Sequence, residues 1–275
     1  ARDEITSQIF DSFNYFYFFE DCFDENSIFF YSCKYQYDKI VKIFMEILKK
    51  EIEYDRITIH QAAELNQIEI IYFLLQKENK ISEDLFRNCE KLVKIAIPPS
   101  IISIENNAFC RCTSLVKIVI PSTVTKIGLY AFSSCHSLKT IYIPSSVKEI
   151  NYGAFDDCSS LENINFPFSM NCTEFGSFQH CYSLKAIEIP FSVTKIHFNA
   201  FYRCKSLTEV IIPSSIKEIG YNAFCECSSL EMVEIPDSVE KIKTGAFSEC
   251  HLFDNIKIPS TTKVDHIYIR YGGCS

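Results

Sequence analysis

Proline recurs at one fixed spacing along most of the chain, and this spacing limits the fold more than any other feature. The prolines follow one another every 23 residues without an insertion, at Pro98, Pro121, Pro144, Pro167, Pro190, Pro213, Pro236 and Pro259. A cysteine column from Cys89 to Cys250 and a phenylalanine column from Phe86 to Phe247 keep the same step. A fixed period of about 20 to 50 residues is typical of stacked repeat proteins, in which neighbouring units together bury a core that one unit cannot bury alone.

The first half of the unit predicts a short strand. Counted from its cysteine, the unit has the sequence C-x-S-L-x-x-I-x-I-P-S-S-V-x-x-I-x-x-x-A-F-x-x. A β-branched run such as Ile118-Val119-Ile120 favours a strand, and proline then ends it because proline has no N–H for a β-ladder. Side chains alternate between the two faces of a strand. We therefore expect positions 7 and 9, nearly always Ile or Val, to face the core, and the variable positions 6 and 8 to form an exposed sheet face.

The second half of the unit is predicted to turn the chain back. Two apolar anchors stand three residues apart, for example Val147 and Ile150, and an Ala-Phe pair follows four residues later. Burial of one phenylalanine contributes about 2–3 kcal/mol, so this residue supplies much of the core of each unit. The alanine beside it leaves room for the ring.

Fourteen cysteines admit two interpretations. A small secreted domain would use them in disulfides. A column in register instead suits small buried residues with a weak S–H donor, and we favour buried free thiols. Cys110 and Cys225 each form a C-x-C pair with a ladder cysteine, but they lie five units apart and cannot share one metal ion. The reactivity of the cysteines outside the column stays open, at Cys110, Cys172, Cys225 and Cys274.

The pattern L-x-x-I-x-I-P-S-S-V-x-x-I-x-x-x-A-F-x-x-C resembles the 23-residue leucine-rich repeat of the BspA-like, or Treponema-type, family over about residues 84 to 265. The resemblance implies a right-handed solenoid with a parallel sheet on its concave side. It also implies a non-enzymatic surface protein that binds host or matrix proteins. Two units depart from the pattern, one at Met170, Thr173 and Ser177 and the last at Thr262 and Asp265.

Residues 1–82 contain no proline, no glycine and no trace of the 23-residue period. Stretches beginning at Tyr31 and Gln61 align with each other and have an apolar pattern of helical period. The segment from Ile59 to Ala63 also resembles the L-H-x-A-A motif of an ankyrin repeat, with a helical cap of another type as the alternative. Either form would cover the open end of the solenoid, whose first strand is otherwise a bare edge.

The expected fold is therefore α+β, with two parts. Residues 1–82 form an α-helical, ankyrin-like N-terminal region that caps the solenoid. Residues 83–275 form a leucine-rich repeat β-solenoid of about eight units, each a parallel strand plus a turn, and the last unit is degenerate.

No motif points to catalysis, a cofactor or a metal. The chain lacks phosphate-binding glycine loops, H-E-x-x-H and G-x-S-x-G, and its six histidines occupy unrelated positions of the unit. A net charge of −8 argues against nucleic acid as a partner. The aromatic stretch FNYFYFFEDCF is shorter than the roughly 20 residues of a membrane-spanning helix, so we expect no membrane insertion.

Two surface columns are candidates for binding a partner. The exposed sheet face changes from basic and apolar to acidic along the chain, and its candidate residues are Lys117, Val119, Lys139, Tyr142, Glu188, Glu209, Ile211 and Glu234. The alternative surface is a column of aromatic residues at position 18 of four consecutive units, Tyr152, Phe175, Phe198 and Tyr221. Aromatic side chains at this spacing can also simply pack on one another.

These features predict a non-catalytic scaffold that binds another protein, and the family resemblance implies a host or matrix protein. The alternative is an intracellular adaptor or a self-associating structural repeat protein. The resemblance places the protein at a cell surface, whereas free thiols and the lack of a visible secretion signal favour the cytoplasm.

Overall fold

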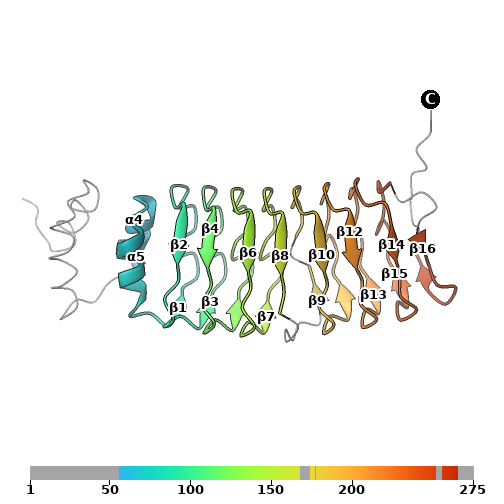
Figure 1. Cartoon of the computed structure of the whole chain (residues 1–275), viewed down its shortest axis with the longest axis horizontal. Helices are drawn as coiled ribbons and strands as arrows, with labels where there is room; N and C mark the ends of the chain where they lie inside the picture. Colours follow the sequence, from blue (N-terminus) through green and yellow to red (C-terminus); the bar gives the residue numbers. More distant parts are fainter. Residues whose placement is uncertain (1–55, 168–173, 177, 252–255, 266–275) are drawn as a thin grey trace, which may run out of the picture.

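The structure, a computed structural model, describes residues 56–167, 174–176, 178–251 and 256–265. It is an elongated solenoid of stacked coils that contain short β-strands, with a helix pair at its N-terminal end (Figure 1). The helices are α4 (Arg56–Glu64) and α5 (Ile68–Leu75). Within the described ranges, neither the length nor the hydropathy of any helix is sufficient to cross a bilayer.

One strand per unit forms a first parallel ladder, as the sequence predicts. Within a hydrogen-bonded pair, a strand lies parallel to the strand one unit further on, so that Lys94 lies opposite Lys117 and Ile95 opposite Ile118. Hydrogen bonding joins the strands two by two, and the pairs stack in sequence order along the solenoid. The strands are β2 (Lys94–Ala96), β4 (Lys117–Val119), β6 (Thr140–Tyr142), β8 (Asn163–Asn165), β10 (Ala186–Glu188), β12 (Glu209–Ile211), β14 (Val233–Glu234) and β16 (Ile256–Lys257).

A second parallel ladder lies where the sequence predicts only a turn. Two residues per unit form each of its strands. The strands are β1 (Lys80–Ile81), β3 (Ser103–Ile104), β5 (Lys126–Ile127), β7 (Glu149–Ile150), β9 (Glu174–Phe175), β11 (Lys195–Ile196), β13 (Glu218–Ile219), β15 (Lys241–Ile242) and β17 (Lys263–Val264). They lie at positions 15 and 16 in all units except two, and the second of them is then the apolar anchor, whereas β9 lies at positions 17 and 18 and β17 at positions 14 and 15.

This second ladder changes at both units whose sequences depart from the pattern. It divides into a sheet from β1 to β7 and a sheet from β9 to β17, and the division falls in the unit of Met170 and Thr173. In the last unit, β17 pairs one residue out of step, with Lys263 opposite Lys241. Val264 is half-exposed there.

Stacked phenylalanine rings form the centre of the core. The rings from Phe86 to Phe247 are fully buried, and successive centroids lie 5.0–5.8 Å apart with the planes within 16° of parallel. Each ladder cysteine from Cys112 to Cys250 donates its S–H to the carbonyl of the phenylalanine 26 residues earlier, at 2.9–3.3 Å. All of these thiols are buried and free, which confirms the interpretation of the column.

The helix pair packs on the first turn of the solenoid. Ile71 and Leu74 of α5 are fully buried in the same apolar cluster as Phe86. Polar contacts also join the two parts: Ser100 Oγ donates to the Leu75 carbonyl at 3.1 Å, and Val93 N donates to Asn66 Oδ1 at 3.0 Å. The pair therefore covers the end of the stack. Its likeness to an ankyrin repeat stays a prediction, and the stretch from Tyr31 lies outside the described residues.

Candidate functional site

The first ladder presents one sheet face to solvent. We call it the variable face, and it comprises the residues at positions 5, 6 and 8 of each unit from β2 to β14. In the three-residue strands the middle side chain is buried and its two neighbours are exposed. Tyr142 is 68% exposed, and Val119 and Ile211 are each 51% exposed. Parallel strands lie about 4.8 Å apart, so these side chains form a regular array on a rigid support.

All the residues predicted for this face are exposed, but they fall into two groups. Lys117 and Val119 lie on β4, Tyr142 lies on β6, and Lys139 precedes β6. The second group occupies three further strands, with Glu188 on β10, Glu209 and Ile211 on β12, and Glu234 on β14. The structure brings the members of each group together, with β8 between the two groups.

A depression of about 390 Å³ lies over β8, β10 and β12, at the acidic end of the variable face. The small side chain of Ala186 lines it, and so does Phe191, which is 61% exposed. Its exposed polar lining comprises Asn163, Asn165, Glu188 and Glu209. Phe191 and the two asparagines are not among the residues predicted from the sequence. Phe191 had a detectable signal, because half of the units have serine at this position after the proline.

The carboxylates on this face differ in their pairing. Glu162 Oε2 accepts a hydrogen bond from Lys185 Nζ at 2.7 Å, and this contact lowers the pKa of Glu162. Among the described residues no ion pair involves Glu188, Glu209 or Glu234. Three adjacent strands therefore carry carboxylates that form no ion pair within the described residues, beside the exposed apolar side chains of Ile211 and Phe191.

The aromatic column at position 18 is partly packed. The Tyr152 and Phe198 rings stack at 5.4 Å although they belong to units that are not adjacent, and Lys243 Nζ lies 5.2 Å from the centre of the Tyr221 ring. Phe198 and Tyr221 remain about half-exposed. The prediction that Phe175 belongs to this column is wrong, because β9 pairs two residues out of step and places the Phe175 backbone opposite Ile196. The side chain of Phe175 lies outside the described residues. The column therefore combines ring contacts with an exposed apolar surface.

One cluster of side chains contains the residue types of a nucleophile–base site, a serine, a histidine and a carboxylate. Ser134 Oγ and His136 Nε2 both contact Asp157 Oδ2, at 3.2 and 3.0 Å. The histidine and the serine thus share one carboxylate and are not arranged so that the histidine could accept the serine proton, as a nucleophile–base relay requires. This cluster lies at an exposed turn.

Asp156 is the one buried charged residue among those described. Burial raises the pKa of its carboxyl to about 7, opposed by a hydrogen bond from the Gln179 backbone N–H to Asp156 Oδ1 and assisted by the charge of Asp157. A carboxyl whose pKa is raised on folding binds more protons when folded, so stability is greatest below the unfolded pKa and falls as the pH rises toward 7.

We expect Asp156→Asn to stabilise the protein above pH 7 by about 2–4 kcal/mol and to change little near pH 4. The asparagine can keep the bond from the Gln179 N–H without the cost of a buried charge. Chemical denaturation at pH 4.5, 6 and 8 measures the difference, with the neighbouring Asp157→Asn as the control. Equal effects of Asp156→Asn on stability at all three pH values would contradict a raised pKa of the Asp156 carboxyl.

Comparison with known proteins agrees with this architecture. The solenoid of parallel 23-residue units with an apolar core defines a leucine-rich repeat scaffold. Residues 79–194 and 173–269 match the family described as "BspA type Leucine rich repeat region (6 copies)". The chain belongs to this BspA-type leucine-rich repeat family. No curated protein sequence matches it.

Several solved structures are similar. A leucine-rich repeat protein from Bacteroides ovatus shares 26% identity with a TM-score of 0.53, covering 66% of this chain and 54% of its own. The leucine-rich repeat protein of T. pallidum shares 32% identity with a TM-score of 0.51, covering 58% of this chain and 77% of its own. A protein from Eubacterium ventriosum shares 25% identity with a TM-score of 0.55, covering 62% of this chain and 45% of its own. The chain thus spans about half the length of the Bacteroides protein.

Proposed function

We propose that the protein is a binding scaffold whose variable face contacts another protein, centred on the depression over β8, β10 and β12. One observation carries this proposal. The depression combines exposed apolar side chains, Phe191 and Ile211, with the carboxylates of Glu188 and Glu209 on a rigid sheet. Repeat proteins bind partners on such continuous surfaces.

The chemistry of the depression indicates the kind of partner surface that fits. An apolar side chain would fill the space over Ala186 against Ile211, and lysine or arginine side chains beside it would meet the glutamates. The variable face is wide enough for a partner to contact several of its strands at once. We therefore infer a partner with basic side chains around an apolar centre. The family resemblance supports a host or matrix protein as that partner.

Charge reversal at Glu188, Glu209 and Glu234 tests the proposal. We expect the triple variant Glu188→Lys, Glu209→Lys and Glu234→Lys to weaken binding at least tenfold at low salt, with a smaller difference at high salt because exposed charges are screened. Its melting temperature should stay within a few degrees of the parent, since exposed charges contribute little to stability. Binding is measured against immobilised matrix proteins and against partners captured from cell lysate.

A matched control changes the net charge equally on the opposite ladder. Glu149→Lys, Glu218→Lys and Glu240→Lys alter three carboxylates that lie on or beside β7, β13 and β15. This control should bind like the parent. If the control weakens binding and the first variant does not, the partner contacts the second ladder and the proposed surface is wrong. Changing Tyr152, Phe198 and Tyr221 to serine examines the aromatic column in the same assay.

A second candidate function is self-association, and one observation favours it. The variable face carries lysines on β2 and β4 and unpaired glutamates from β10 to β14, so that two antiparallel copies would bring opposite charges together. Light scattering at low and high salt distinguishes the two functions. A monomer at both ionic strengths contradicts self-association and leaves the scaffold proposal in place.

A further inference from the structure

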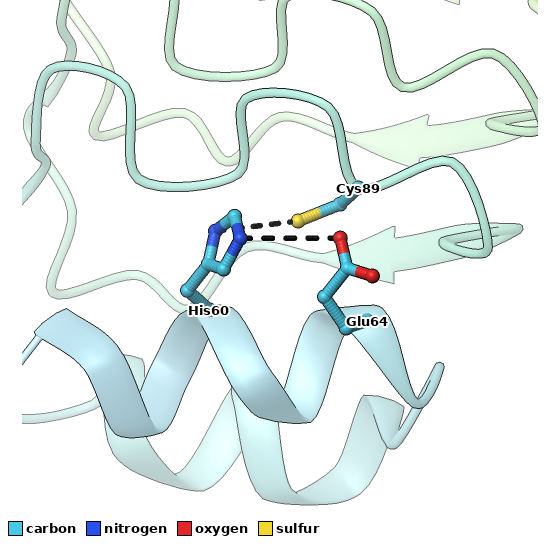
Figure 2. A group of neighbouring side chains, drawn as sticks. All are labelled: His60, Glu64 and Cys89. Atoms are coloured by element: carbon cyan, nitrogen blue, oxygen red, sulfur yellow. Dashed lines mark hydrogen bonds and ion pairs between the residues drawn. The ribbon is translucent and has the colours of Figure 1, made fainter.

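Three side chains with metal-binding atoms meet where the helix pair packs on the solenoid. His60 and Glu64 lie one turn apart on α4, and Cys89 is the first cysteine of the ladder. Figure 2 shows the two helix side chains pointing toward the Cys89 sulfur. Their donor atoms all lie within 4.8 Å of one another, with His60 Nε2 3.9 Å from Glu64 Oε1.

Cys89 differs from every later member of the ladder in what its thiol contacts. From Cys112 onward, each thiol donates to a phenylalanine carbonyl of the core. Cys89 begins the ladder and has no earlier phenylalanine of the repeat above it. Its Sγ instead lies 3.6 Å from His60 Nδ1, on the side of the helix. The first thiol of the column therefore faces a histidine and a carboxylate.

The hydrogen bonding of His60 directs its other nitrogen to this group. His60 Nδ1 lies 2.9 Å from the Leu85 carbonyl oxygen, which can only accept, so Nδ1 carries a proton. In the neutral ring Nε2 then has a lone pair, and it faces a carboxylate oxygen that also has only lone pairs. Metal-binding histidines usually donate their second ring N–H to a backbone carbonyl or carboxylate in this manner.

We propose that His60 Nε2, the Glu64 carboxylate and the Cys89 thiolate bind a divalent transition-metal ion of the zinc class. Thiolate and imidazole together favour zinc over magnesium or calcium, which prefer oxygen ligands. Zinc bonds of about 2.0–2.3 Å place tetrahedral ligand atoms about 3.4–3.7 Å apart. The 3.9 Å between His60 Nε2 and Glu64 Oε1 would shorten slightly, and the Cys89 sulfur, which lies 3.6 Å from Nδ1 and within 4.8 Å of the other ligand atoms, would shift toward Nε2. Water completes the fourth position, because His60 and Glu64 are each about 40% exposed.

Binding would replace the S–H bond of Cys89 with a sulfur–metal bond and release one proton to solvent. Burial, followed by the charge of Glu64, raises the pKa of this thiol to about 12, so without the ion the thiol is protonated at neutral pH. The ion would join α4 to the first repeat across the junction. Its role would be structural: it would hold the helix pair in place as the cap of the solenoid.

Zinc binding to the full chain tests this site. The reduced protein is freed of metal with a chelator, dialysed against defined free Zn²⁺, and its bound zinc is measured. We expect wild type to bind one zinc more per chain than Glu64→Gln or Cys89→Ser, and each variant to bind at this site at least about tenfold more weakly. Cobalt in place of zinc should give a thiolate-to-cobalt absorption band that Cys89→Ser abolishes.

Cys112→Ser is the matched control, because Cys112 occupies the same ladder position one unit later and its thiol bonds to the Phe86 carbonyl. It should keep the zinc and the cobalt band. Glu64→Gln changes a half-exposed side chain and keeps the test valid if the buried serine variants fail to fold. Zinc should also raise the melting temperature of wild type more than that of Glu64→Gln. Equal zinc content in wild type, Glu64→Gln and Cys89→Ser, or none in wild type, overturns the proposal.

Discussion

Replacing Phe132 with alanine is expected to lower the free energy of unfolding by about 3–5 kcal/mol. The Phe132 ring is fully buried and lies between two parallel rings, 5.2 Å from Phe109 and 5.5 Å from Phe155. A solenoid has no other layer that can move in to fill the cavity, since each unit contacts only its neighbours. The loss should therefore approach the upper end of the range. Chemical denaturation followed by circular dichroism measures it.

The same substitution at Phe191 is the control, because this ring lines the depression and is mostly exposed. Phe191→Ala should change stability by less than about 1 kcal/mol. The Phe132 variant should also broaden the transition, since weakening one layer uncouples the units on its two sides. Equal losses for the two variants would contradict a core built on the stacked rings.

Replacing Leu74 with aspartate is expected to separate the helix pair from the solenoid. Leu74 of α5 is fully buried in the cluster that contains Phe86, and a carboxylate without a partner there costs several kcal/mol. Loss of the helix pair exposes the apolar end of the first repeat and the bare strand edges of β1 and β2, which are templates for pairing with another chain. We expect oligomers or aggregates in light scattering and early unfolding of the first units in hydrogen exchange.

Gln76→Asp is the control for this variant, because Gln76 is exposed just after the same helix. It introduces the same charge within two residues and should leave the protein monomeric. A Leu74→Asp protein that is monomeric and as stable as Gln76→Asp would show that the helix pair is not a cap.

The first ladder could be predicted from the sequence because its strands alternate strictly. Ile118 and Ile120 face the core while Lys117 and Val119 face solvent, and this alternation is visible in the residues alone. The second ladder could not be predicted in this way. Its strands contain two residues each, such as Lys126–Ile127, which is too short for any period to appear. Only the stacking of successive turns brings these pairs into hydrogen-bonding distance.

The candidate site was predictable in outline for a similar reason. Positions free of core packing can vary, so the variable face was visible as a set of columns. The depression was not, because its shape depends on the small Ala186 and on Phe191, which comes from outside the strands. The pairing of Glu162 with Lys185 was also hidden, since it depends on how two long side chains meet across neighbouring units.

The cluster at the cap junction illustrates a further limit. Cys89 has the same place in the sequence pattern as the later ladder cysteines, and nothing in the repeat sets it apart. Its environment differs because a helix, and not another repeat, covers it. Contacts between the helix pair and the first repeat cannot be obtained from the period of the repeat.

Carboxyl labelling of the protein, free and bound to a captured partner, tests the central claim most directly. A carbodiimide couples an amine to each exposed carboxylate, and mass spectrometry compares the labelling of every glutamate in the two states. We predict that Glu188, Glu209 and Glu234 lose reactivity in the complex while Glu149, Glu218 and Glu240 on the opposite ladder keep theirs. Protection of the second set with full labelling of the first would contradict binding through the variable face.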